Sequence, residues 1–122
     1  MDEIRSALLI DNNDVENFIN HRLLQSHGVT HIISFHDADS ALAYLKDTHV
    51  DYHLIIVNID APEIKGIEFI EQFYEAGLEK TQGEIYALSS SANSVKKIKS
   101  ENRNIKSLSK PFTMDQLVNR DE

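Results

Sequence analysis

Leu54-Ile55-Ile56-Val57 is the most strand-like run in the sequence, with four consecutive apolar residues of which three are β-branched. Such runs are typical of strands that are buried on both faces of a parallel sheet. Similar short runs, the last of them weak, lie on either side of it at Ala7–Ile10, Ile32–Phe35, Ile85–Leu88 and Ile105–Leu108. The sequence therefore predicts five strands.

Amphipathic helical patterns follow the predicted strands. We predict that the first helix begins with Asp14 as its N-cap and ends near Gly28, and that the third helix stops at Gly77. The residues predicted to form the apolar faces of the five helices are Val15, Phe18, Ile19 and Leu23; Ala38, Ala41, Leu42 and Leu45; Ile67, Ile70 and Phe73 or Tyr74; Val95 and Ile98; and Met114, Leu117 and Val118.

The alternation of strands and helices predicts the topology. Strands that alternate with helices at this spacing favour a parallel sheet with helices on both faces. Right-handed crossovers leave few arrangements, and the five-stranded one is the flavodoxin-like, doubly wound α/β fold with strand order 2-1-3-4-5. The length of 122 residues suits one domain over residues 1–122.

Composition narrows the possible functions. The 12 basic and 20 acidic residues give a net charge of −8, which disfavours binding to nucleic acid. No apolar run approaches the roughly eighteen residues of a membrane span, and Met1–Arg5 does not resemble a signal peptide, so we expect a cytoplasmic protein without membrane association. The absence of cysteine excludes thiol chemistry, and the six histidines have no spacing that favours a metal site.

The functional residues of such a fold lie at the carboxyl ends of the strands, beside the switch point between the first and third strands. Polar residues follow four of the predicted strands. They are Asp11 and Asn12 after the first, Asn58 and Asp60 after the third, Ser89 after the fourth and Lys110 after the fifth. We expect Asp11, Asn58, Ser89 and Lys110 to converge at one end of the sheet.

Three motifs make the chain resemble a known family. They are Lys110-Pro111-Phe112, the apolar strand followed by Asp11, and the Pro62…Gly66 loop followed by Ile67-Glu68-Phe69-Ile70. In this order and spacing the sequence resembles the receiver domain of two-component response regulators, of the chemotaxis-regulator-like kind, from Ala7 to Val118. The resemblance implies a signalling module without its own enzymatic activity. It also implies a sensor histidine kinase or phosphotransfer protein and a downstream protein target as partners.

The resemblance assigns a role to each position at the strand ends. Asp11 and Asn12 stand where the family has an acidic pair that holds Mg²⁺, and Asp60 stands where a main-chain carbonyl contacts the metal. Asn58 stands at the phosphoacceptor position, where an Asp is expected. Ser89 and Lys110 stand where side chains contact the phosphoryl oxygens.

The two asparagines change the expected chemistry. The amide of Asn58 lacks the nucleophilic oxyanion that phosphoryl transfer requires, so phosphorylation at this position is not expected. Only Asp11 remains of three carboxylates, and we therefore expect Mg²⁺ to bind weakly or not at all. Asn58 is a natural loss, an engineered replacement or a misaligned position, and Asp60 is a possible substitute acceptor. For Asp11, Asn12 and Asn13 a purely structural role in the loop stays open.

Three functions remain in competition. The first is a stand-alone receiver domain in a phosphorelay, without an effector domain, acting as a protein-interaction module and existing as a monomer or weak homodimer. The second is a phosphorylation-independent pseudo-receiver, held in one state by an Asp11–Lys110 pair. The third and most remote is a small α/β phosphatase-like enzyme. Such an enzyme would have a second Asp two residues after Asp11, where Asn13 stands.

Overall fold

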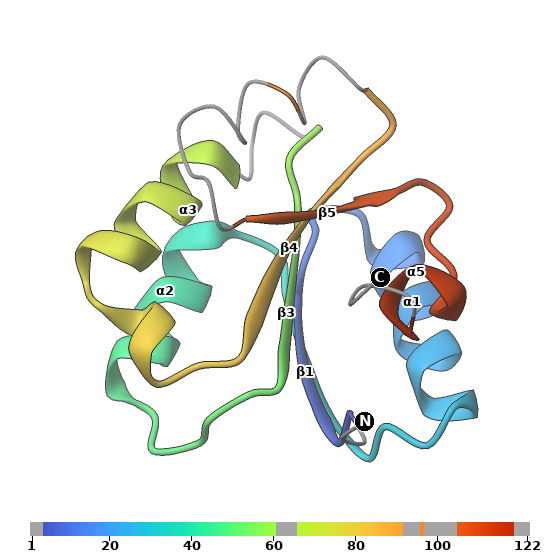
Figure 1. Cartoon of the computed structure of the whole chain (residues 1–122), viewed down its shortest axis with the longest axis horizontal. Helices are drawn as coiled ribbons and strands as arrows, with labels where there is room; N and C mark the ends of the chain where they lie inside the picture. The colour runs from blue at the N-terminus through green and yellow to red at the C-terminus, as the bar shows by residue number, and fades with distance from the viewer. Residues whose placement is uncertain (1–3, 61–65, 92–95, 97–104, 119–122) are drawn as a thin grey trace.

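Five parallel strands form a single sheet at the centre of the molecule (Figure 1). The computed structural model describes residues 4–60, 66–91, 96 and 105–118. The strands are β1 (Ser6–Ile10), β2 (His31–Phe35), β3 (Leu54–Asn58), β4 (Glu84–Ser89) and β5 (Lys106–Ser109). Their order is β2-β1-β3-β4-β5, which confirms the predicted flavodoxin-like topology.

Helices cover both faces of the sheet. The described helices are α1 (Asp14–Ser26), α2 (Ala38–Asp47), α3 (Gly66–Glu75), the 3₁₀ helix η1 (Leu78–Lys80) and α5 (Met114–Val118). Helices α1 and α5 lie on one face and α2 and α3 on the other, as Figure 1 shows. The helix predicted around Val95 and Ile98 lies outside the described residues. None of the described helices has the length and apolar character needed to cross a bilayer.

The alternation of side chains along β1 explains why its sequence is continuously apolar. Leu8 and Ile10 belong to the core cluster under α2 and α3, whereas Ala7 and Leu9 belong to the cluster under α1 and α5. Successive residues of a strand point to opposite faces, so a strand covered on both sides is apolar along its middle, and the polar Ser6 and Asn58 stand only at the ends of β1 and β3. Every residue of β1 and of β3 is buried accordingly.

The first turn of α1 differs from the prediction. Asn13, and not Asp14, is the N-cap: its side chain accepts a hydrogen bond from the backbone N–H of Glu16 at 3.0 Å. Asp14 is the first residue of the helix, where its negative charge faces the positive end of the helix dipole. An Asn cap three residues before Glu16 satisfies a backbone donor that the helix leaves unpaired.

The predicted apolar face of α1 is wrong for three of its four residues. Val15, Phe18 and Ile19 are 65%, 62% and 56% exposed. The buried residues of the helix are Asn17 and Leu24. The Asn17 Nδ2 donates to the Asp11 carbonyl at 2.9 Å and to the Phe35 carbonyl at 3.4 Å. The polar Asn17 thus faces the sheet, whereas Val15, Phe18 and Ile19 face solvent.

Gly66 allows the start of α3 to lie directly against the end of β3. A Cβ atom on Gly66 would lie 2.9 Å from the Ile59 Cγ2 and 3.1 Å from the Asn58 carbonyl oxygen. Real Cβ contacts of 2.9 Å are essentially not seen, so a larger residue would push the helix away. Gly66 thus helps to set the position of the residues that follow β3.

Candidate functional site

Polar residues gather at the carboxyl edge of the sheet. Asp11 follows β1, Asn58 ends β3, Ser89 ends β4, and Lys110 follows β5. The first three are almost completely buried, whereas Lys110 keeps 22% of its side chain exposed. The Lys110–Pro111 peptide bond is cis. Because the strands are parallel, these four positions share one edge, as expected from the sequence.

The side chain of Asp60 is the centre of the hydrogen-bond network at this edge. Its Oδ1 accepts a hydrogen bond from the Ser89 hydroxyl at 2.5 Å. Its Oδ2 accepts from the backbone N–H and the hydroxyl of Ser90, each at 2.9 Å, and lies 3.2 Å from the Lys110 Nζ. Four donors therefore converge on one carboxylate that is 23% exposed.

These contacts determine the charge of Asp60. Burial by itself raises the pKa of the carboxyl group, but the hydrogen bonds from Ser89, Ser90 and Lys110 outweigh it and lower the pKa to about 2. The carboxylate is consequently ionised at neutral pH. Sequence reasoning placed the main chain of Asp60 at a metal and kept its carboxylate open as a substitute acceptor, but it did not predict the contacts of this side chain with Ser89, Ser90 and Lys110. The signal available was an acidic residue after β3 together with the Ser89-Ser90-Ser91 run after β4.

Lys110 does not pair with Asp11, and the predicted Asp11–Lys110 pair is wrong. The ammonium group of Lys110 lies 3.2 Å from the Asp60 carboxylate and 3.6 Å from that of Glu16. The Oδ1 of Asp11 instead accepts the backbone N–H of Asn13 at 2.9 Å. Lys110 therefore neutralises the carboxylates of Asp60, after β3, and of Glu16, on α1. One carboxylate oxygen of Asp11 is bound within the loop that follows β1.

Asn58 has a structural contact within its own turn. Its Oδ1 accepts the backbone N–H of Asp60 at 2.9 Å, and the residue is 3% exposed. This bond fixes the amide at the start of the turn that carries Asp60 toward Ser89. The amide holds the backbone in place and supplies no nucleophilic oxyanion.

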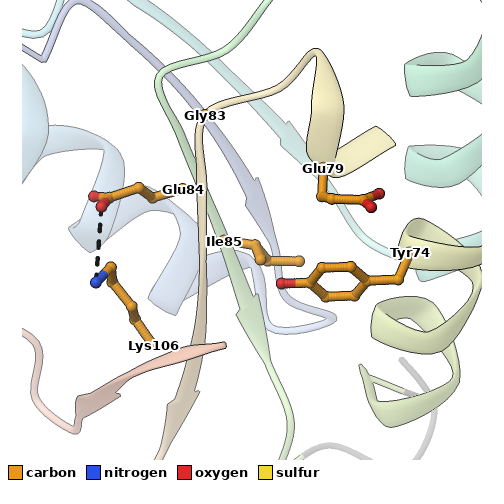
Figure 2. Close-up of a pocket in the computed structure, with 6 residues that line it drawn as sticks. All are labelled: Tyr74, Glu79, Gly83, Glu84, Ile85 and Lys106. Carbon is orange, nitrogen blue, oxygen red and sulfur yellow. Dashed lines mark ion pairs between the residues drawn. The ribbon is translucent and has the colours of Figure 1, made fainter. Parts of the chain in front are cut away.

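A separate hollow lies at the amino ends of β4 and β5. It has a volume of about 210 Å³, and Figure 2 shows the ring of Tyr74 pointing toward Ile85 inside it. At its side, Glu84 and Lys106 form an ion pair of 3.9 Å, with 36% and 39% of their side chains exposed. Exposed pairs of this kind contribute little to stability. None of the predicted site residues lines the hollow, which is therefore not the candidate site.

Comparisons with known proteins agree with this fold. The family model of the response regulator receiver domain matches residues 7–121, and the chain belongs to this family. A comparison with curated proteins gives no match. Proteins of this family work in two-component signalling, typically as non-enzymatic modules. They interact with histidine kinases or phosphotransfer proteins and with downstream targets.

Solved structures show the same fold. The bacteriophytochrome response regulator AtBRR is 19% identical, with 96% of this chain and 89% of that chain covered and a TM-score of 0.80. A two-component response regulator from Legionella pneumophila is 21% identical, with 93% and 92% covered and a TM-score of 0.79. A CheY-like receiver domain from Methylobacillus flagellatus is 20% identical, with 94% and 93% covered and a TM-score of 0.76.

Receiver domains generally bind Mg²⁺ at the acceptor site, but the residues present here fit that ion poorly. The Oδ2 of Asp11 is buried without a hydrogen-bond partner and is one suitable ligand. The Asn58 Oδ1 already accepts the Asp60 N–H, and the Asp60 carboxylate is held by Ser89, Ser90 and Lys110. Within the described ranges, no group of three His, Cys, Asp or Glu residues is arranged to hold a metal. Weak or absent Mg²⁺ binding stays a prediction.

Proposed function

We propose that this receiver domain is a phosphorylation-independent protein-interaction module in two-component signalling. The observation that carries the proposal is the position of the Asp60 carboxylate. It lies against Ser89, Ser90 and Lys110, and the family resemblance assigns contacts with the phosphoryl oxygens to Ser89 and Lys110. The Asp60 carboxylate thus occupies the hydrogen-bond donors of Ser89 and Lys110 that a bound phosphoryl group would need.

The chemistry of position 58 supports the same conclusion. Phosphoryl transfer requires a nucleophile in line with the leaving group, together with fixed donors that neutralise the developing charge. Asn58 provides no such nucleophile. An incoming phosphoryl group would also have to displace an ionised carboxylate that four donors stabilise. Nucleophilic attack from position 58 and binding of the transferred phosphoryl group are therefore both disfavoured.

A conventional phosphorelay receiver is the second candidate, with Asp60 as a substitute acceptor. Its favourable feature is the short contact of Asp60 with Ser89 and Lys110, groups suited to stabilise phosphoryl oxygens. The same contacts lower the basicity of the carboxylate, since its pKa is about 2. A carboxylate of low basicity is a weaker nucleophile, so we favour the phosphorylation-independent function. In both cases the partners are a histidine kinase or phosphotransfer protein and a downstream protein.

Intact-mass measurement tests the proposal directly. The purified protein is incubated with Mg²⁺ and acetyl phosphate, beside the variants Asn58→Asp, Asp60→Asn and the double variant. We expect no mass gain for the original protein and slow gain of one phosphoryl group for Asn58→Asp. The double variant should gain it faster, because Ser89 and Lys110 are then released from Asp60.

A matched control separates the site from a general effect of charge. Asp51 is exposed and precedes the amino end of β3, whereas the site lies at the carboxyl end, so Asp51→Asn should behave as the original protein. A mass gain of one phosphoryl group on the original protein would contradict the proposal. Loss of that gain in Asp60→Asn, but not in Asp51→Asn, would identify Asp60 as the acceptor.

A further inference from the structure

The outward face of α1 carries an exposed apolar stripe. Of the large hydrophobic residues that are exposed in the described ranges, three lie on this helix and the fourth is Val50. Val15, Phe18 and Ile19 are each more than half exposed. Phe18 and Ile19 follow Val15 by three and four residues, so the three side chains lie on one side of the helix. Contiguous exposed apolar residues of this kind mark interaction surfaces.

The charges along this stripe are arranged asymmetrically. Asp14 and Glu16 lie in the first turn of α1, and Arg22 lies one turn beyond Phe18, with its guanidinium carbon 5.9 Å from the centre of the Phe18 ring. Within its own chain Asp14 contacts His36 at 3.0 Å, and Glu16 contacts Lys110 at 3.6 Å. The stripe is therefore acidic at one end, apolar in the middle and basic at the other end.

A groove runs beside Phe18 between α1 and the edge strand β2. It has a volume of about 460 Å³. Among the side chains that line it are Phe18, Arg22 and, from the end of the edge strand and the residue after it, Ser34 and His36. The groove is open and large enough to receive an aromatic side chain from another molecule. The stripe thus combines an aromatic projection with a recess next to it.

We propose that α1 packs antiparallel against α1 of a second copy of this chain. In a two-fold interface the same surface is used twice, so the acidic end of one helix meets the basic end of the other. Phe18 and Ile19 would lie near the two-fold axis, and Asp14 of each copy would face Arg22 of the other. The antiparallel arrangement also brings opposite ends of the two helix dipoles together.

Charge favours a second copy as the occupant of this face. The whole chain carries a net charge of −8, so two copies repel each other over most of their surfaces. The stripe is an exception, because Arg22 balances Asp14 along it, and Glu16 of the same turn is paired with Lys110 of its own chain. A partner for this face must place a basic group against Asp14, an apolar group against Phe18 and an acidic group against Arg22. A second α1 in the antiparallel direction meets that requirement. Three apolar side chains per copy form a small interface, so the dimer is weak.

Sedimentation velocity of the full chain tests the dimer. The weight-average sedimentation coefficient should rise with protein concentration between roughly 10 µM and 1 mM, the range expected for a small interface. Phe18→Asp should weaken the association at least about tenfold, because it places a charge at the centre of the apolar contact. Val50→Asp is the matched control, since Val50 is exposed outside α1, and it should leave the association unchanged. Thermal melts verify that both variants are folded.

A charge-reversal pair tests the antiparallel geometry. Asp14→Arg and Arg22→Asp should each weaken self-association, because like charges then face each other twice. An equimolar mixture should form a heterodimer as strong as the original dimer, since opposite charges face each other at both ends. The proposal is wrong if the original protein stays monomeric at 1 mM, if Phe18→Asp and Val50→Asp act alike, or if the mixture associates no better than each variant. A monomer whose binding to a phosphotransfer protein is lost in Phe18→Asp would assign the face to that partner instead.

Discussion

Replacing Asp60 with Asn keeps the shape of the side chain and removes the charge that four donors stabilise. The pKa of this carboxyl group is lowered from 3.8 to about 2 in the folded protein. Each unit of difference corresponds to about 1.4 kcal/mol, so the charged form contributes on the order of 2 kcal/mol to the free energy of unfolding. The side chain is only 23% exposed, and solvent screening reduces this value little. Asp60→Asn should therefore lower the free energy of unfolding by about 2 kcal/mol at pH 7.

The sign of the pH dependence follows from the direction of the shift. A carboxyl group whose pKa is lower in the folded state adds stability above its unfolded pKa, near 4. That stability is lost as the pH falls through the folded value of about 2. The difference between the original protein and Asp60→Asn should stay constant from pH 7 to 5. It should fall to roughly half at pH 3.

Urea unfolding at pH 7, 5 and 3 measures this difference. The exposed control Asp51→Asn should change the free energy of unfolding by no more than about 0.5 kcal/mol. Equal stability of Asp60→Asn and the original protein at pH 7 would show that the four contacts provide no net stabilisation. A deficit that is the same at all three pH values would show that it arises from packing and not from the charge of Asp60.

Three further changes test the candidate site and the packing of the fold. Isothermal titration should detect no tight Mg²⁺ binding to the original protein. Asn58→Asp combined with Asn12→Asp should gain a binding signal and a Mg²⁺-dependent rise in melting temperature, because three carboxylates then face the ion. Gly83→Ala should lower the free energy of unfolding by about 1–3 kcal/mol in urea melts, since the added Cβ would overlap the backbone of His53. Asn17→Ala should cost about 1–3 kcal/mol in the same assay, because it removes the buried donor that bonds to two backbone carbonyls. An unchanged free energy of unfolding in either of these last two variants would contradict the contacts of Gly83 and Asn17.

The strands and their order could be predicted because burial on both faces leaves a direct trace in sequence. Leu54–Val57 has no polar residue, as required of a strand between two helical layers, and the structure has a strand there at Leu54–Asn58. The positions at the carboxyl edge follow from the parallel topology once the strands are known. Local sequence was a weaker guide to helix orientation. Val15, Phe18 and Ile19 have helical spacing, but the spacing alone does not say whether their face meets the sheet or the solvent.

The family resemblance implies that Asn58 stands where a nucleophile would be needed. The sequence by itself determined that Asn58, Ser89 and Lys110 lie at the ends of the third, fourth and fifth strands. These are properties of residue identity and strand register, which local hydrophobic patterns encode. Only the tertiary structure decided that Lys110 pairs with Asp60 and Glu16, and that the Asp60 carboxylate accepts the hydrogen bond of the Ser89 hydroxyl. Ion pairs and hydrogen bonds act over a few ångströms between residues far apart in the chain. Their partners depend on the direction of each turn after a strand, and no spacing in the sequence records that direction.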